Sequence, residues 1–159
     1  MRMHIGISLL FCFGLAIVFT PGGWAQSSDR ISATTIPQDR LIQPEELNRE
    51  LQDHPHALLL LQVGSRMLFD EVHIPGAEYA GPASRPEGLE ALRARVGDLP
   101  RDRALVIYCG CCPWDHCPNM GPAWALLHRM GFTNVRALYL ADNFGADWVA
   151  KGYRAEKSQ

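Results

Sequence analysis

Several features are missing from this sequence of 159 residues, and each absence narrows the class of protein. The 15 Lys and Arg residues are outnumbered by 17 Asp and Glu residues, which gives a formal net charge of -2. Nucleic acid and anionic membrane surfaces are therefore not expected as partners, because no basic field attracts them. No internal repeat or low-complexity tract interrupts the chain, and its length suffices for one domain with a single hydrophobic core.

Cysteine is absent from most of the chain. Apart from Cys12, every cysteine lies between Cys109 and Cys117. A disulfide framework for a small secreted fold would spread its cysteines along the chain to close long loops, whereas these four can link only the loop that contains them. The cluster is therefore not expected to hold the fold together.

The amino terminus, residues 1–25, has the pattern of a secretory signal peptide. Its uncharged, mostly apolar run over residues 5–19 is shorter than the roughly 20 residues that a membrane-spanning helix needs. Small residues at Gly23 and Ala25 suit cleavage after Ala25, so we expect a periplasmic or secreted protein with no stable membrane association after cleavage. The alternative is an uncleaved anchor, whose helix would have to run through Pro21 and two glycines.

Beyond the leader, the sequence predicts a flexible spacer followed by one folded domain. Residues 26–40 are rich in Ser, Thr, Gln and Asp and form the expected spacer, and residues 41–157 form the expected domain. Strands are predicted at residues 57–63, 78–80, 105–108 and 135–140, and helices at residues 44–54, 66–72, 86–96, 121–130 and 143–151. This alternation predicts an α/β fold with a mostly parallel central sheet and helices on both faces.

The stretch over residues 105–130 predicts a strand, a cysteine-rich loop and a helix in succession. This order places Cys109 at the carboxyl end of a buried strand, and ligands of parallel α/β sheets usually bind in the crevice beyond that end. Backbone N–H groups of the loop and the start of the next helix carry partial positive charge, which favours a thiolate. Cys109 is therefore the candidate nucleophile.

Six short motifs within residues 41–157 carry a family resemblance. They are P-E-E-L at residues 44–47, L-L-Q-V at 60–63, H-I-P-G-A at 73–77, L-V-I-Y-C at 105–109, L-L-H-R-M-G-F-T-N-V at 126–135 and D-W-V-A-K-G-Y at 147–153. Together they resemble a single rhodanese-like domain. The resemblance implies a sulfurtransferase or persulfide carrier without a cofactor, in which Cys109 accepts sulfane sulfur from a small donor and passes it to a thiol acceptor.

The loop also departs from the family pattern. Rhodanese-like loops are commonly shorter and include an arginine for an anionic donor, and Asn119 stands where that arginine would be. Without a guanidinium, bidentate capture of thiosulfate or phosphate is lost, which argues against efficient thiosulfate:cyanide transfer and against the related cysteine phosphatases and arsenate reductases. Gln62 and Gly64 likewise stand where the family usually has an acidic residue and an arginine, and Arg66 is the candidate to compensate.

The additional loop cysteines allow three interpretations. In the first, Cys111, Cys112 and Cys117 are redox partners that resolve a persulfide or sulfenate on Cys109 and leave a disulfide. In the second, the four thiolates and His116 bind a soft metal such as Cu(I) or Zn(II) in a non-enzymatic module. In the third, a disulfide from Cys117 to Cys111 or Cys112 only shapes the loop. A catalytically inactive rhodanese fold used for binding is a further alternative.

The other loop residues are expected to support this chemistry or the loop itself. The candidate active-site loop also contains Gly110, Pro113, Trp114, Asp115, His116, Pro118, Asn119 and Met120. A protonated His116 would lower the pKa of a neighbouring thiol, and a solvated loop histidine is the alternative. Asp115 would raise that pKa unless it orients His116. Trp114 is expected to pack, the two prolines to stiffen the loop, and His73 to be structural.

Overall fold

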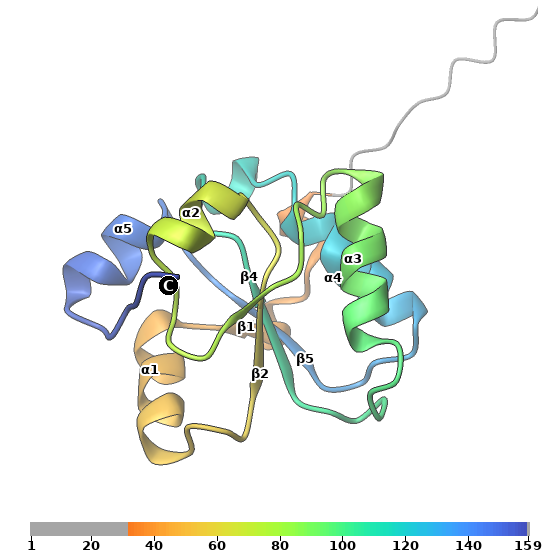
Figure 1. Cartoon of the computed structure of the whole chain (residues 1–159), viewed down its shortest axis with the longest axis horizontal. Coiled ribbons are helices and arrows are strands. Elements are labelled where there is room, and N and C mark those ends of the chain that lie inside the picture. Colours follow the sequence, from red (N-terminus) through yellow and green to blue (C-terminus); the bar gives the residue numbers. More distant parts are fainter. Residues whose placement is uncertain (1–31, 159) are drawn as a thin grey trace, which may run out of the picture.

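The computed structural model describes residues 32–158, in which helices cover both faces of a central sheet (Figure 1). The sheet contains β1 (Leu41–Ile42), β2 (Leu59–Gln62), β3 (Glu78–Tyr79), β4 (Leu105–Tyr108) and β5 (Val135–Leu138). All neighbouring strands pair in parallel, in the spatial order β1-β5-β4-β2-β3. The predicted α/β fold is confirmed. The predicted signal peptide, residues 1–25, lies outside the described residues.

The helices alternate with the strands along the chain. They are α1 (Pro44–Asp53), α2 (Arg66–Glu71), α3 (Pro86–Val96), α4 (Met120–Arg129) and α5 (Phe144–Asp147), with short 3-10 turns η1 (Ala33–Thr35), η2 (Gln38–Arg40), η3 (Trp114–His116) and η4 (Val149–Lys151). Proline opens α1 and α3, where its fixed φ suits the first helical turn and its missing N–H has no intrahelical partner to lose. Within the described residues, no helix is both long and apolar enough to cross a membrane.

The two central strands are buried on both faces, which explains their near-continuous apolar sequences. Alternate residues of a strand point to opposite faces. Leu61 and Ile107 therefore belong to the cluster that packs against α3 and α4, whereas Leu60 and Val106 belong to the cluster that packs against α1 and α5. In Figure 1 these two helix groups lie on opposite sides of the sheet.

The amino-terminal segment of the domain differs from the prediction. Residues 32–40 were expected to be part of a flexible spacer, yet they form η1 and η2 and lead directly into β1. Ala33 and Ile36 are 0% and 4% exposed, and η1 contacts α4 and η3. Two apolar residues in a polar stretch thus complete the core over α4, and the folded domain begins before residue 41.

The carboxyl-terminal segment is tied to the turn before β3. His73 forms an isolated antiparallel bridge with Glu156, and its Nδ1 lies 2.7 Å from the carbonyl oxygen of Phe69. Its ring stacks on the Phe69 ring, with centroids 4.0 Å apart, and is nearly inaccessible to solvent. These contacts confirm the structural role predicted for His73.

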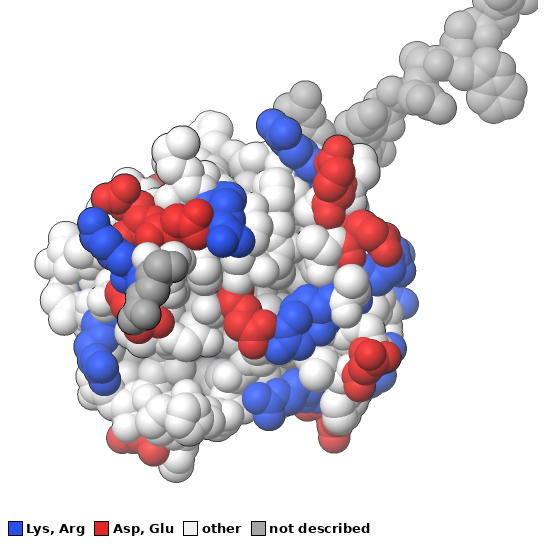
Figure 2. Space-filling model, viewed as in Figure 1, with Lys and Arg blue, Asp and Glu red and all other residues white. Residues whose placement is uncertain are grey.

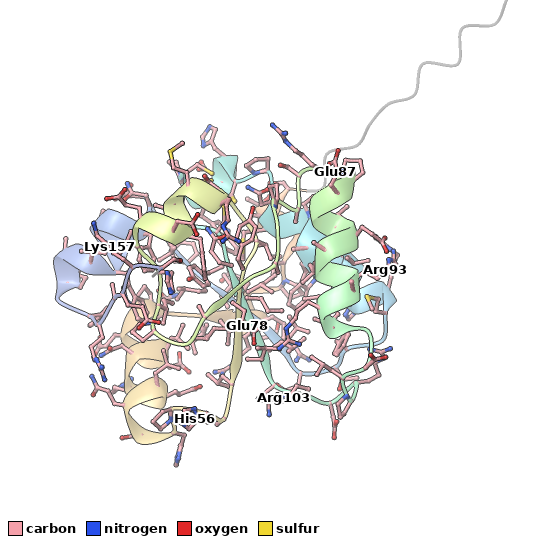
Figure 3. The ribbon with its side chains drawn as sticks, in the orientation of Figure 1. His56, Glu78, Glu87, Arg93, Arg103 and Lys157 are labelled. Atoms are coloured by element: carbon pink, nitrogen blue, oxygen red, sulfur yellow. The ribbon has the colours of Figure 1, made fainter. Side chains whose placement is uncertain are left out.

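Charged side chains lie on the periphery of the domain. On the face shown in Figure 2, basic and acidic side chains lie side by side, and no patch of one sign covers that face. Glu87 and Arg93 project from the outer side of α3, whereas Glu78 of β3 lies near the middle of the view in Figure 3 and pairs with Arg95. This last pair ties the edge strand β3 to α3.

Candidate active site

Cys109 is the first residue after β4, at the carboxyl edge of the sheet where the sequence predicts it. Its side chain is only 3% exposed and belongs to the apolar cluster beneath α4. Gly110 then turns the chain with a φ of 83°, and a Cβ atom at this position would lie 2.7 Å from the Cβ of Phe144. The conformation and the crowding both require glycine, so the turn fixes where the loop leaves the strand.

The four loop cysteines come together and carry free thiols. The Sγ of Cys109 lies 3.1 Å from the Sγ of Cys111, which lies 3.4 Å from the Sγ of Cys112. The sulfur atoms of Cys109, Cys112 and Cys117 all lie within 4.8 Å of one another. Cys111 is exposed, Cys112 is partly buried, and the other two are buried. The loop thus has one exposed thiol and a sheltered group of three.

Asn119 occupies the centre of this arrangement. Its Nδ2 donates to the Sγ of Cys109 at 3.3 Å, and its Oδ1 accepts a hydrogen bond from the backbone N–H of Ser84 at 2.9 Å. The side chain is 4% exposed. A neutral amide therefore contacts the sulfur from the position that the family resemblance assigns to an arginine. We expected main-chain N–H groups around Cys109, but those of Asn119 and Met120 instead lower the pKa of Cys117.

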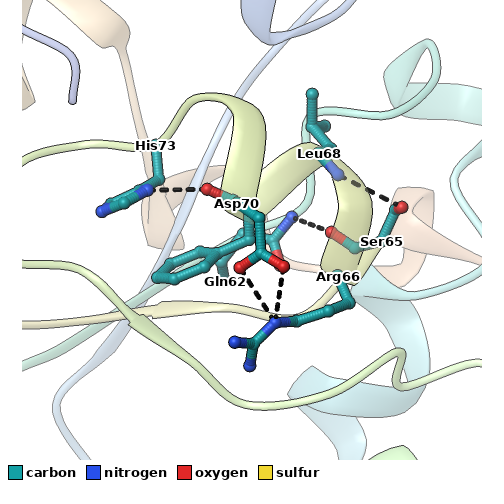
Figure 4. A network of polar contacts seen from close by, with 7 residues as sticks. Gln62, Ser65, Arg66, Leu68, Asp70 and His73 are labelled. Atoms are coloured by element: carbon teal, nitrogen blue, oxygen red, sulfur yellow. Dashed lines mark hydrogen bonds and ion pairs between the residues drawn. The ribbon is translucent and has the colours of Figure 1, made fainter. Parts of the chain in front are cut away.

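Gln62 and Gly64 shape the other side of Cys109. Because β2 and β4 pair in parallel, the residues that follow them lie side by side. The Gln62 Nε2 donates to the carbonyl oxygen of Ser65 at 3.4 Å (Figure 4). It also donates to the carbonyl oxygen of Cys109 at 3.1 Å, and the Gln62 Oε1 accepts from the N–H of Gly64. A Cβ atom at Gly64 would lie 2.6 Å from the Cys109 Sγ. Glycine thus leaves room for the sulfur, a role that the sequence did not reveal.

Arg66 does not compensate for the missing loop arginine. Its Nε lies 2.9 and 3.0 Å from the two carboxylate oxygens of Asp70 (Figure 4). Its guanidinium lies over the Tyr79 ring. Both contacts are on the outer side of α2 and β3, where Arg66 is exposed. The predicted compensation is therefore not supported.

Hydrogen bonding among the thiols separates their pKa values. The pKa of Cys109 is raised because its thiol donates to Cys111 and because the side chain is buried. The same hydrogen bond, accepted by Cys111, lowers the pKa of Cys111 far below its usual range. Burial raises the pKa of Cys112. The pKa of Cys117 is raised, because contact with Cys111 and burial outweigh the lowering effect of Cys109. The hydrogen bonds thus favour a thiolate at Cys111 over one at Cys109, where the sequence predicts it.

A small cavity adjoins the Cys109 sulfur. It is lined by Cys109, Gly110, Cys112, Trp114, Cys117, Met120, Leu138 and Leu140. Its volume is about 10 Å³, which is room for about one water-sized particle. Trp114 walls the cavity and also packs against Tyr139, as predicted, with ring centroids 5.3 Å apart. Among the described residues, none with a charged side chain lines this cavity.

Asp115 and His116 lie on η3, away from the thiol group. Asp115 Oδ1 and His116 Nδ1 are 2.7 Å apart, and both side chains are largely exposed. Among the described residues, the one cluster suited to a metal ion consists of Cys109, Cys112 and Cys117 and does not include His116. The predicted fifth donor is therefore not brought to the site. Pro113 and Pro118 flank η3 at the loop surface.

Comparisons with known proteins agree with the fold. A family model described as a Rhodanese-like domain matches residues 43–140. The rhodanese-like domain of an Anabaena protein is similar with a TM-score of 0.57 and 23% identity, covering 75% of this chain and 80% of that one. A Bacillus halodurans protein gives a TM-score of 0.57 and 17% identity over 73% of this chain and 75% of that one. A rhodanese-related protein of Thermoplasma volcanium gives a TM-score of 0.51 and 16% identity, covering 75% of this chain and 99% of that one. No curated protein matches the chain.

Proposed function

The chain belongs to the rhodanese-like domain family, and from this we propose that it is a sulfurtransferase or persulfide carrier whose Cys109 holds sulfane sulfur. The observation that supports this proposal most directly is the contact between the Asn119 amide and the Cys109 sulfur at the carboxyl edge of the sheet. A persulfide carries charge on its outer sulfur, and a fixed N–H donor stabilises such charge without a side-chain base. The adjoining cavity has room for about one water-sized particle, which is the space that the outer sulfur of a persulfide would enter.

The transfer that loads Cys109 conserves electrons. The Cys109 sulfur bonds to the outer sulfur of a donor persulfide, and the sulfur–sulfur bond of the donor breaks. The donor leaves as a thiol, which takes the proton that the Cys109 thiol gives up. A small or protein-bound persulfide suits this site as donor. Thiosulfate does not, because the residues lining the cavity bring no positive charge to its two negative charges. We therefore expect thiosulfate:cyanide transfer to be slow.

The distances support a resolving role for a second loop cysteine. Cys111 is the closest sulfur to Cys109, at 3.1 Å. Its thiolate can attack the inner sulfur of a Cys109 persulfide, forming a Cys109–Cys111 disulfide and expelling the outer sulfur as hydrosulfide. The outer sulfur is reduced and the two cysteines are oxidised, so the electrons balance. Attack by an external thiol on the outer sulfur passes the sulfur on instead.

A soft-metal site is the second candidate function. The sulfur atoms of Cys109, Cys112 and Cys117 lie within 4.8 Å of one another, and thiolates that share one Zn ion through bonds of about 2.3 Å lie at most about 4.6 Å apart. Soft thiolates select Cu(I) and Zn(II). Binding there would occupy Cys109 and so exclude its persulfide.

One experiment separates the two functions. The reduced protein is purified anaerobically, its bound metal is measured, and it is treated with glutathione persulfide before intact-mass analysis. We expect wild type and the matched variant Cys112→Ser to gain one sulfur atom, which peptide mapping places on Cys109, and we expect Cys109→Ser to carry no sulfur at residue 109. A metal-loaded protein that never gains sulfur would overturn the proposal and favour the metal site.

We also propose that the protein is exported, on the pattern of residues 1–25. Intact mass of the protein recovered from the periplasm or medium should correspond to cleavage after Ala25. The same spectrum counts the free thiols, because each disulfide lowers the mass by two hydrogens. An unprocessed chain held in the membrane fraction would contradict the proposed export.

A further inference from the structure

We propose that Cys111, not Cys109, is the first acceptor of the sulfur, and that it relays the sulfur inward to Cys109. This inference rests on the proposed function and assigns its first step to a different residue. The two closest sulfur atoms of the loop differ in their solvent exposure and in their polar partners. Cys109 has the polar partners that suit a held persulfide, and Cys111 has the access to solvent that loading requires.

Access to Cys109 is narrow, because only 3% of the residue is exposed. Gly64 packs so close that one added carbon would overlap the sulfur, and Asn119 covers a second side. The adjoining cavity of about 10 Å³ has room for one sulfur atom but not for a donor that brings at least two sulfur atoms and a carbon chain. A donor therefore cannot align its sulfur–sulfur bond with the Cys109 sulfur without opening the loop.

Cys111 is the one loop cysteine that solvent reaches freely. Cys117 is buried, and Cys112 is partly buried and lines the cavity. A donor that meets Cys111 at the surface delivers its sulfur to a position close to Cys109, since the two Sγ atoms are 3.1 Å apart. A sulfur–sulfur bond measures about 2.05 Å, so in-line transfer of one sulfur atom needs the two Sγ atoms about twice that distance apart, and the exposed Cys111 side chain reaches this separation by rotating outward.

Both steps of the relay balance in atoms and electrons. First, the Cys111 thiolate bonds to the outer sulfur of the donor persulfide, and the donor leaves as a thiol. Second, the Cys109 sulfur bonds to that same sulfur atom while the bond from Cys111 breaks. Cys109 gives its proton to the departing Cys111 sulfur along the hydrogen bond that joins them. The sulfur is transferred without net oxidation, and Cys111 is free for the next donor.

The relay gives the buried position a purpose. On Cys109 the outer sulfur lies in a small cavity without charged side chains, beside one amide donor, and fills the space that an external thiol would need to reach it. Release follows the same path in reverse, from Cys109 to Cys111 and then to an external thiol. The exposed thiol thus exchanges sulfur, and the buried thiol stores it.

The test follows the rate and the place of loading. Reduced wild-type protein, Cys109→Ser, Cys111→Ser and the control His116→Ala, at an exposed loop residue away from the thiols, are mixed anaerobically with glutathione persulfide, quenched with an alkylating agent at increasing times and mapped by peptide mass spectrometry. We expect Cys111→Ser to load Cys109 at least tenfold more slowly than wild type, and His116→Ala to load it within about twofold of wild type. In Cys109→Ser the sulfur should remain on Cys111.

The outcomes distinguish the relay from the function on which it rests. If Cys111→Ser loads Cys109 at the wild-type rate, or if Cys109→Ser never carries sulfur on Cys111, the relay is wrong and the proposed function stands. If wild type itself gains no sulfur from glutathione persulfide, both fail. Thermal unfolding of each variant is measured as a control, and an unchanged transition temperature is expected if the substituted side chain leaves the fold intact.

Discussion

The loop between β4 and α4 has two parts that differ in almost every physical property. Its root comprises Cys109, Gly110, Cys117 and Asn119, which are all buried, and its tip comprises Cys111, Asp115 and His116, which are all exposed. Root contacts join distant parts of the chain, as when Asn119 accepts from Ser84, whereas the Asp115 and His116 side chains contact each other. The difference teaches that one short loop can place a buried thiol and an exposed thiol next to each other, which is the arrangement that the proposed relay requires.

The root should be far less tolerant of substitution than other turns of the same conformation. Gly110→Ala adds a Cβ atom at positive φ and only 2.7 Å from Phe144, so we expect a loss of about 3 kcal/mol in the free energy of unfolding. Gly131 has a φ of 86°, and a Cβ atom there would meet nothing within 4 Å, so Gly131→Ala should cost only about 1 kcal/mol. Urea denaturation measures both, and equal losses would show that the root is not crowded.

The tip should reveal its thiolate in its reaction with an alkylating agent. When the pH falls from 8 to 6, the thiolate fraction of an ordinary thiol with a pKa near 8.5 falls about 80-fold, and its alkylation rate falls by the same factor. The pKa of Cys111 is lowered far below this range by the hydrogen bond from Cys109, so its rate should hardly change over the same interval. Peptide mapping after brief iodoacetamide treatment gives the rate, and the urea-unfolded protein is the reference. If the alkylation rate of Cys111 in the folded protein fell as steeply between pH 8 and pH 6 as in the unfolded reference, Cys111 would not be the thiolate.

The amide at the root should matter to both stability and sulfur binding. Asn119→Ala removes a buried amide that donates to Cys109 and accepts from the N–H of Ser84, so we expect a loss of about 2 kcal/mol in the free energy of unfolding. It should also shorten the lifetime of the Cys109 persulfide. The control is Asn134→Ala, because Asn134 makes a comparable hydrogen bond at the surface, to Asp102, and should change stability by less than about 0.5 kcal/mol. Similar losses for the two variants would mean that burial of Asn119 contributes nothing.

Much of the fold was predictable because its signals are local. The apolar runs of β2 and β4 and the proline that opens α3 each indicate their element within a few neighbouring residues. β1 gave no such signal, because a pair of residues is too short to show a period. Burial of Ala33 likewise depends on contact with α4, which lies far along the chain, and this is why the spacer was predicted too long.

The site was predictable in part. A strand, a loop and a helix in succession place Cys109 at the sheet edge from local pattern alone. Its polar surroundings come from Gln62, Gly64 and Asn119, which are brought together by the parallel pairing of β2 with β4 and by the return of the chain into α4. The sequence showed these three only as departures from a family pattern. Which thiol is exposed depends on the turn at Gly110, and composition contains no information about that.

The smallest effect is expected at the outermost residue of the tip. His116 has 77% of its side chain exposed, and its pairing with Asp115 is between two solvated groups, which contributes little to stability. His116→Ala should therefore change the free energy of unfolding by less than about 0.5 kcal/mol and sulfur loading by less than about twofold. Because η3 carries His116 away from the metal-sized cluster of Cys109, Cys112 and Cys117, the variant should also leave any Cu(I) affinity unchanged. A large loss of loading in this variant would mean that the tip supplies a proton or a positive charge as well as a thiol, and the division between root and tip would then have to include an acid at the surface.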